Sequence, residues 1–233
     1  LIAVTAILLS FIFLSGFSNS YQTKDYNYDV EIHRDTWGVP HIYGQSDKDA
    51  AFGLAYAHCE DDYETIEEVI LALRGEFASV KGYKYAPIDY LVGLLKVWDN
   101  VNSKYDEEIS DEVKLICDAY ADGVNRYIEK NNIKSNIYPA KGKDVVAGFY
   151  FRTPLMFEFD WHLKELMKDD KPSFDKYASR TSTFSMYGSN TIAVSPERSA
   201  DNYTRITTNS HQPWEGPVTW YEAHINSKEG WNM

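Results

Sequence analysis

Residues 188–195 read Gly188-Ser189-Asn190-Thr191-Ile192-Ala193-Val194-Ser195, and at this stretch the patterning of the sequence changes. The stretch itself predicts a short strand. Two more extended patterns follow, at residues 205–209 and 218–225. Before it, the apolar residues recur mainly at helical spacing. The sequence therefore predicts an α+β protein, with a mostly helical first part and a second part that begins with strands.

The first part opens with a hairpin pattern and continues with helices. Val30 and Ile32 alternate with polar residues, and residues 37–40 form a turn before a second extended run. A helix is expected from Asp47, which can cap it, with an interruption at residues 59–62 and an end near Gly75. Further helices are expected over residues 87–130 and 144–167, the second of these punctuated by Pro154.

A connector precedes the first strand of the second part. Residues 168–185 are charged and then rich in Ser and Thr, without a clear period, which is typical of an exposed linker. The linker leads directly to Ser189, and His211 follows that serine by 22 residues. A Gly-Ser-Asn sequence by itself is a common turn. The linker before Ser189 and the histidine 22 residues after it are what point to a function.

These residues resemble the penicillin acylase family, whose precursors are cut ahead of a Ser that is followed by Asn. Gly188, Ser189 and Asn190 match that junction. Residues 209–214, Asn-Ser-His-Gln-Pro-Trp, match a segment that carries a His in several members. Penicillin G acylase has Gln there, so His211 points toward the cephalosporin acylase and acyl-homoserine lactone acylase branches.

Three blocks of the first part carry the same resemblance, in the order that the family has them. Residues 32–44 resemble its opening strand and turn, residues 53–61 its next helix, and residues 73–76 its Arg-Gly region. The resemblance covers residues 30–223.

The resemblance implies a domain plan and a fold. Residues 1–20 would be a truncated signal peptide, 21–167 the helical first chain, 168–188 a released spacer and 189–233 the start of a second chain. The fold would be the αββα sandwich of N-terminal nucleophile hydrolases, with only its first strands present and the helical chain wrapped around it. The two chains would form a heterodimer after self-cleavage. The family's oxyanion-hole donors would lie beyond Met233.

The chemistry of a serine explains why cleavage would matter. A serine hydroxyl is a weak nucleophile that needs a nearby base. When Ser189 becomes N-terminal, its α-amine, with a pKa of about 8, can take the hydroxyl proton, whereas an amide nitrogen cannot. Gly188 gives the cleaved bond backbone freedom. By analogy His211 orients the Ser189 hydroxyl and assists processing; without the family match it would read as a core or hairpin histidine.

Other sites follow less directly. Family members hold a structural calcium partly through the first chain, and Glu158 is the residue of this sequence expected to serve as that ligand. Phe149, Met156 and Phe157 lie in an apolar run that is core by default, and the resemblance makes them candidates for the acyl pocket. Catalysis needs no cofactor. Glu60, Asp61 and Asp62 form either a carboxylate or cation site or, as the simpler interpretation, a solvated charge cluster.

Composition limits the partners and the compartment. The net charge is -12 and the basic residues form no cluster, which argues against a nucleic-acid partner. Residues 1–18 form an apolar run typical of a secretory signal, with a membrane anchor as the alternative, so an exported, periplasmic or secreted protein without a stable anchor is expected. The two cysteines, Cys59 and Cys117, lie in helical patterns without zinc spacing and are expected to be structural.

The sequence thus predicts a self-processing amidohydrolase that acts on linear amides. A long-chain N-acyl amide, such as an acyl-homoserine lactone or a lipopeptide, is the first choice of substrate, and a penicillin or cephalosporin side chain is the alternative. A non-catalytic exported binding protein of the same fold is a different class of function. Hydrolysis by Asp61 or Asp62 is a further alternative, supported only by their adjacency.

Overall fold

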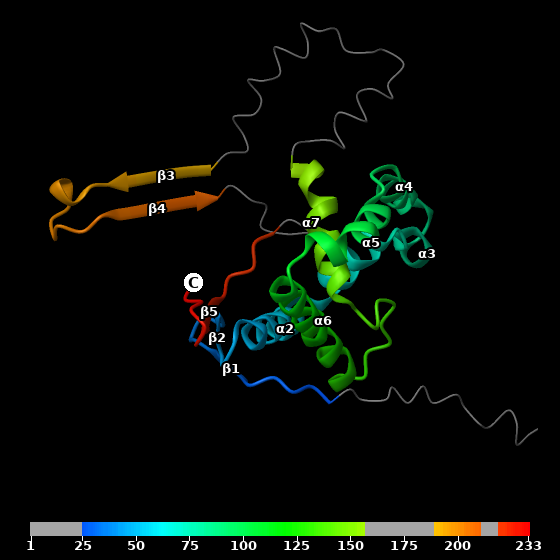
Figure 1. Cartoon of the computed structure of the whole chain (residues 1–233), viewed down its shortest axis with the longest axis horizontal. Coiled ribbons are helices and arrows are strands. Elements are labelled where there is room, and N and C mark those ends of the chain that lie inside the picture. The colour runs from blue at the N-terminus through cyan, green and yellow to red at the C-terminus, as the bar shows by residue number, and fades with distance from the viewer. Residues whose placement is uncertain (1–24, 157–188, 211–218) are drawn as a thin grey trace, which may run out of the picture.

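The chain has the α+β organisation that the sequence predicts (Figure 1). The computed structural model describes residues 25–156, 189–210 and 219–233. Helices make up most of the first range, and the last two ranges contain the strands β3, β4 and β5 with no α-helix. The signal and connector predictions, residues 1–20 and 168–188, lie outside these ranges, so the predicted domain boundaries stay predictions.

The predicted hairpin is present as β1 (Val30–Arg34) and β2 (Pro40–Gly44), which pair antiparallel. The Asp35 carboxylate fixes the turn, because its Oδ1 accepts the N–H groups of Trp37 at 2.8 Å and Val39 at 3.0 Å. A strand from the far end of the chain, β5 (His224–Ser227), then pairs parallel to β2. The sheet order is therefore β1-β2-β5, so the two parts of the chain share one sheet.

The long helix α2 (Asp47–Arg74) confirms the predicted helix with its interruption. Asp62 has non-helical angles, φ -152° and ψ 63°, and divides the helix at a kink. The predicted cap at Asp47 is wrong: Ser46 is the N-cap and forms a capping box with Asp49. Asp47 instead binds the second part of the chain, with its N–H on Glu229 at 2.8 Å and its carboxylate on the Ser227 hydroxyl.

Gly75 ends α2 in the left-handed region, at φ 70°, where glycine avoids the steric cost of a side chain. The chain continues through α3 (Phe77–Lys81), the 3-10 turn η1 (Tyr83–Tyr85), α4 (Ala86–Leu94), α5 (Val97–Glu108) and α6 (Asp111–Lys130). These elements confirm the predicted helical region. Helix α6 lies along α2 so closely that a Cβ on Gly123 would come within 2.4 Å of the Phe52 carbonyl oxygen.

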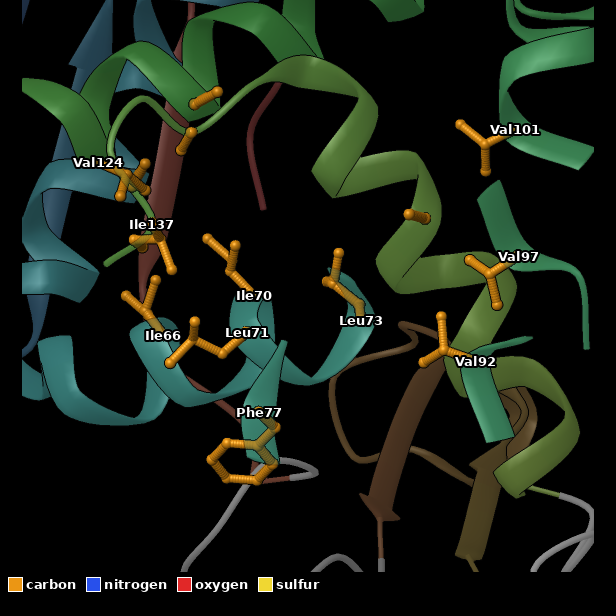
Figure 2. Packing of buried hydrophobic residues seen from close by; sticks show 14 of the residues in the cluster. Ile66, Ile70, Leu71, Leu73, Phe77, Val92, Val97, Val101, Val124 and Ile137 are labelled. Atoms are coloured by element: carbon orange, nitrogen blue, oxygen red, sulfur yellow. The ribbon is translucent and has the colours of Figure 1, made fainter. Parts of the chain in front are cut away.

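The helices enclose one main hydrophobic core, which Figure 2 shows from close by. Leu71, Ile128 and Ile137 are at most 1% exposed. Removing a side chain of this size from water contributes about 1.5–3 kcal/mol to the stability of the fold. Cys59 and Cys117 are buried free thiols, and burial raises the pKa of Cys59 to about 12, so the structural interpretation of both cysteines is confirmed.

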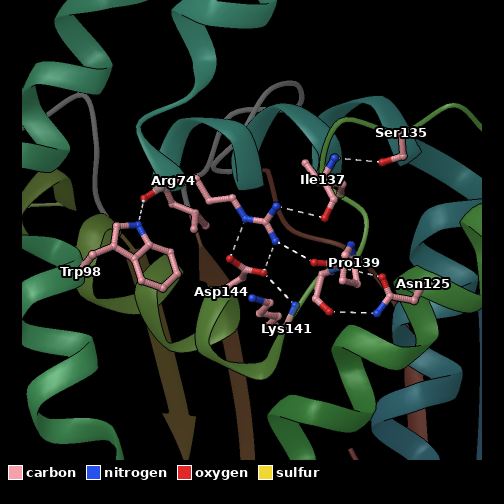
Figure 3. A network of polar contacts seen from close by, with 10 residues as sticks. Arg74, Trp98, Asn125, Ser135, Ile137, Pro139, Lys141 and Asp144 are labelled. Atoms are coloured by element: carbon pink, nitrogen blue, oxygen red, sulfur yellow. Dashed lines mark hydrogen bonds and ion pairs between the residues drawn. The ribbon is translucent and has the colours of Figure 1, made fainter.

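Helix α7 (Gly142–Met156) is locked to α2 by a buried ion pair (Figure 3). The Arg74 guanidinium donates to both carboxylate oxygens of Asp144, at 2.9 and 2.6 Å. It also donates to the backbone carbonyls of Ile137 and Pro139, which fastens the loop that leads into α7. Arg74, from the Arg-Gly block noted in the sequence, therefore positions α7.

The second part begins with the hairpin of β3 (Ser189–Val194) and β4 (Arg205–Ser210), joined through the 3-10 turn η3 (Pro196–Arg198). Residues 189–193 and all of β4 are exposed. The third strand, predicted at residues 218–225, begins later than predicted. Residues 219–223 form no strand, and β5 begins at His224. Pairing with His41 of β2 sets that start.

Candidate active site

Ser189 is the first residue of β3 and is exposed to solvent. Its partner across the antiparallel ladder is Ser210, the residue that directly precedes His211 in the sequence. The next pair joins Asn190 to Asn209. The hairpin thus explains the 22-residue spacing, because the chain leaves Ser189 along β3 and returns to it along β4. Gly188 and His211 themselves lie outside the described residues.

Phe149, on α7, is the member of the predicted acyl pocket whose side chain the structure describes. It is 72% exposed, and Tyr150 beside it is 40% exposed. Their neighbour Ala147 is buried in the core. The default interpretation of the run as core therefore holds for Val146, which is partly buried against the core, but not for Phe149 or Tyr150. The Met156 side chain, Phe157 and Glu158 lie outside the described parts of the structure.

The acidic residues at the kink of α2 pair with Arg34 of β1. Arg34 donates to Asp61 at 2.9 Å and to Glu60 at 3.2 Å, and also to the carbonyls of Gly38 and Ala57. Burial would lower the pKa of Arg34, but the hydrogen bonds to the two carboxylates outweigh it and raise the pKa. Asp61 is therefore neutralised by a guanidinium, which argues against its use as a hydrolytic carboxylate.

Tyr221, from the second part of the chain, joins this cluster. Its hydroxyl donates to Asp61 Oδ2 at 2.5 Å, and its ring stacks on His58 with centroids 4.3 Å apart. His58 Nδ1 lies 3.2 Å from the Tyr120 hydroxyl, and burial lowers the pKa of His58. His58 is therefore held between these two tyrosines by a ring stack and a hydrogen bond.

A hollow of about 600 Å³ lies against this cluster, between β1, α2 and α6. Its lining is charged and aromatic: Arg34, Gly38, Tyr56, Glu60, Asp61, Tyr127, Lys130 and Asn131. Lys130 lies 5.1 Å from the centre of the Tyr56 ring. A lining of this kind suits a polar group rather than a long acyl chain.

The described parts of the chain contain neither a metal-binding cluster of three or more side chains nor a membrane-spanning helix. Within residues 25–156, 189–210 and 219–233, no group of three or more His, Cys, Asp or Glu side chains is arranged to hold a metal ion. The calcium prediction depends on Glu158, which lies outside those ranges, so it stays a prediction. In the same ranges, no helix is both long and apolar enough to cross a membrane.

The sequence profile of the family described as Penicillin amidase matches residues 29–233. The chain belongs to the penicillin amidase family. The match extends through the first-part hairpin, α2, the Ser189 junction and β5, so it covers both parts of the chain. The resemblance inferred from residues 30–223 is confirmed.

Curated relatives carry two kinds of name. Acyl-homoserine lactone acylase PvdQ of Pseudomonas fluorescens (strain Pf0-1) is 22% identical over 90% of this chain and 30% of its own length. Acyl-homoserine lactone acylase QuiP of Pseudomonas putida is 30% identical over 43% of this chain and 12% of its own. Penicillin acylase 2 proenzyme of Pseudomonas sp. (strain SE83) is 30% identical over 49% of this chain and 15% of its own.

The chain spans about 30% of the length of the PvdQ relatives that it matches. Among solved structures, a thermostable penicillin G acylase from Alcaligenes faecalis aligns with 69% of this chain and 85% of its own chain, at 21% identity and a TM-score of 0.47.

Sequence reasoning missed two sets of polar contacts. Arg34 and Tyr221 meet at Asp61, and His41 meets His224 across the sheet. Single polar residues far apart in the sequence have no period that would pair them. The signals present were weak: Arg34 lies inside the first family block, and His41 and His224 each lie in an extended pattern.

Proposed function

We propose that this chain belongs to a self-processing amidohydrolase in which Ser189 is the nucleophile. The observation that carries the proposal is the position of Ser189, exposed at the first residue of β3 and paired with the residue before His211. Membership of the penicillin amidase family supports it, as do relatives named as acylases.

Processing would be the step that creates the base. The Ser189 hydroxyl attacks the Gly188 carbonyl, the peptide bond to the Ser189 nitrogen breaks, and water hydrolyses the resulting ester. This releases a carboxylate on Gly188 and a free α-amine on Ser189. An α-amine with a pKa of about 8 is roughly one-tenth neutral at pH 7 and half neutral at pH 8, and the neutral form accepts a proton, as the former amide could not.

Substrate hydrolysis would then use the same two groups. The α-amine takes the hydroxyl proton while Oγ attacks the amide carbonyl, and the amine product leaves after receiving that proton. Water then hydrolyses the acyl-enzyme to a free acid. His211 would orient the hydroxyl from the end of β4. Donors for the developing oxyanion would come from outside the described residues.

The proposed substrate is a long-chain N-acyl amide such as an acyl-homoserine lactone. Support comes from the relatives named as acyl-homoserine lactone acylases and from Phe149, an exposed aromatic side chain on α7 that is available for apolar contact. A penicillin or cephalosporin side chain is the second candidate, favoured by the relative named Penicillin acylase 2 proenzyme.

The two chains produced by cleavage would remain together. β5 pairs with β2, Tyr221 donates to Asp61, and Asp47 binds Glu229 and Ser227. All these contacts join residues on opposite sides of Ser189. A heterodimer is therefore the proposed state of the processed enzyme, and export to the periplasm or the medium is its proposed location, inferred from residues 1–18.

Mass spectrometry and N-terminal sequencing of the full-length protein test the processing step. We expect a chain that starts at Ser189 in the wild type and an uncleaved precursor in Ser189→Ala. The matched control is Ser195→Ala, an exposed serine just after β3, which should be cleaved normally. A folded wild-type protein that stays uncleaved would overturn the proposal.

A substrate panel then separates the two candidates. Release of free fatty acid from acyl-homoserine lactones of increasing chain length is expected to exceed release of side-chain acid from penicillins. The reverse order would favour the second candidate, and no hydrolysis by a cleaved enzyme would favour the non-catalytic binding protein.

A further inference from the structure

Two histidines from opposite parts of the chain face each other across the three-stranded sheet. His41 of β2 and His224 of β5 are register partners, so their side chains lie on the same face. Their Nδ1 atoms are 3.3 Å apart, and the rings meet at 64° with centroids 5.2 Å apart.

The outer nitrogen of each ring faces an oxygen that can only accept a hydrogen bond. Asp35 Oδ2 lies 3.6 Å from Nε2 of His41, and Asn232 Oδ1 lies 3.2 Å from Nε2 of His224. Each neutral ring satisfies its partner by carrying its proton on Nε2. Both Nδ1 atoms then present lone pairs to each other, an arrangement that favours a cation between them.

The two outer partners are themselves held in place. The Asp35 carboxylate accepts the N–H groups of Trp37 at 2.8 Å and Val39 at 3.0 Å, which holds it beside His41. Asn232 is placed by its bridge to Asn226 of β5, across the turn that follows that strand. A carboxylate or carbonyl on the far nitrogen is the usual support of a metal-binding histidine, because it fixes the tautomer and the ring orientation.

We propose that His41 and His224 bind a divalent transition-metal ion of the imidazole-preferring class, with Zn²⁺ as the ion expected, through their Nδ1 atoms. Zinc–nitrogen bonds are about 2.0–2.1 Å long. Two such bonds at a tetrahedral angle place their nitrogens about 3.4 Å apart, close to the distance observed. Water completes the coordination. The His41 side chain is 33% exposed, so the ion has access from solvent.

The metal ties β2 to β5, and therefore one part of the chain to the other. His41 precedes Ser189 and His224 follows it. In the processed enzyme, a consequence that rests on the proposed function, the ion would link two separate chains. Metal binding itself does not require cleavage, because the sheet that brings the histidines together is formed in the uncut chain.

Calorimetric titration of the chelator-treated full-length protein with Zn²⁺ tests the site. We expect one ion more to bind to the wild type than to the double variant His41→Gln, His224→Gln. Each single variant loses a ligand, so its affinity should fall by at least the roughly 10–100-fold that loss of an outer-shell partner costs. The matched control is His33→Gln, on the same face in register with His41 but bonded to Glu31 at 2.9 Å, which should bind as the wild type does.

Two outcomes would overturn the proposal. If the wild type and the double variant bind the same number of ions, the two rings share a proton and not a metal. If His33→Gln lowers the zinc affinity as much as the His41 and His224 variants do, the two histidines are not the specific ligands. X-ray absorption at the zinc edge of the wild type does not depend on the folding of any variant, and it should show two imidazole nitrogens; their absence would also overturn the site. The same titration of Ser189→Ala separates the two hypotheses, since zinc binding should persist there whether or not processing occurs.

Discussion

In the helical region from Asp47 to Met156, side chains such as Leu71 and Ile137 are fully removed from solvent. In the β3–β4 hairpin, residues 189–193 and the whole of β4 are exposed. The helices are stabilised by their own packing, while the hairpin presents its first residue, the proposed nucleophile, to solvent. Stability and chemistry are therefore carried by different parts of the chain, and a variant in each part tests this separation.

The largest effect is expected on the chemical side, at Ser189. Ser189→Ala should reduce acyl-amide hydrolysis to the uncatalysed background, because both the nucleophile and the processing step are lost. Its free energy of unfolding should stay within about 0.5 kcal/mol of that of the wild-type precursor before cleavage, since the residue is exposed. The measurements are product release and urea denaturation, with Ser195→Ala as the active control. A large loss of stability would mean that the hairpin is structural after all.

The opposite result is expected at the buried ion pair. Arg74→Met leaves Asp144, whose side chain is 3% exposed, without its guanidinium, and should lower the free energy of unfolding by about 3–5 kcal/mol. Lys104→Met is the matched control, because Lys104 pairs with Glu108 at the surface and should cost less than about 1 kcal/mol. Equal losses in the two variants, measured by urea denaturation, would show that burial of the pair does not matter.

The sequence predicted the helices and strands whose apolar residues recur at regular spacing or whose ends carry a clear signal. The alternation at Val30 and Ile32 predicted the first hairpin. The interruption of the apolar pattern at residues 59–62 predicted the kink at Asp62, and Gly75 predicted the end of α2. Extended patterns were predicted at residues 188–195 and 205–209, and the structure pairs them as the β3–β4 hairpin, a pairing that the sequence left open. Single polar residues were the limit: Ser46 rather than Asp47 caps α2, because a cap depends on backbone angles that the sequence leaves open.

The contacts between the two parts of the chain could not be predicted from the sequence either. His41 and His224 are 183 residues apart, and Tyr221 and Asp61 are 160 apart, so only the folded sheet brings them together. The same fact explains why β5 was predicted too early. Alternation alone favoured residues 218–225, whereas the ladder begins where β2 offers a partner.

A smaller effect is expected where the two parts meet. Tyr221→Phe removes the hydroxyl that donates to Asp61 and should cost about 0.5–1.5 kcal/mol, since that carboxylate is 41% exposed and keeps Arg34. In the processed enzyme the two chains should also separate at a lower urea concentration. Tyr203→Phe, on a side chain that is 70% exposed, should change neither quantity. If Tyr221→Phe also changes neither, the contact does not help to hold the two parts together.

The smallest effect is a dependence on pH at the same junction. Burial lowers the pKa of His58 below its usual value of 6.5, so the folded protein holds the ring neutral while the unfolded chain protonates it more readily. The unfolded state therefore binds more protons as the pH falls below about 6.5, and stability decreases in that direction; above it the contribution is constant. Urea denaturation between pH 7.5 and 5 should show this slope in the wild type and a shallower one in His58→Gln. An unchanged slope would mean that other groups govern the acid side, and that the stack of His58 on Tyr221 tolerates a charged ring.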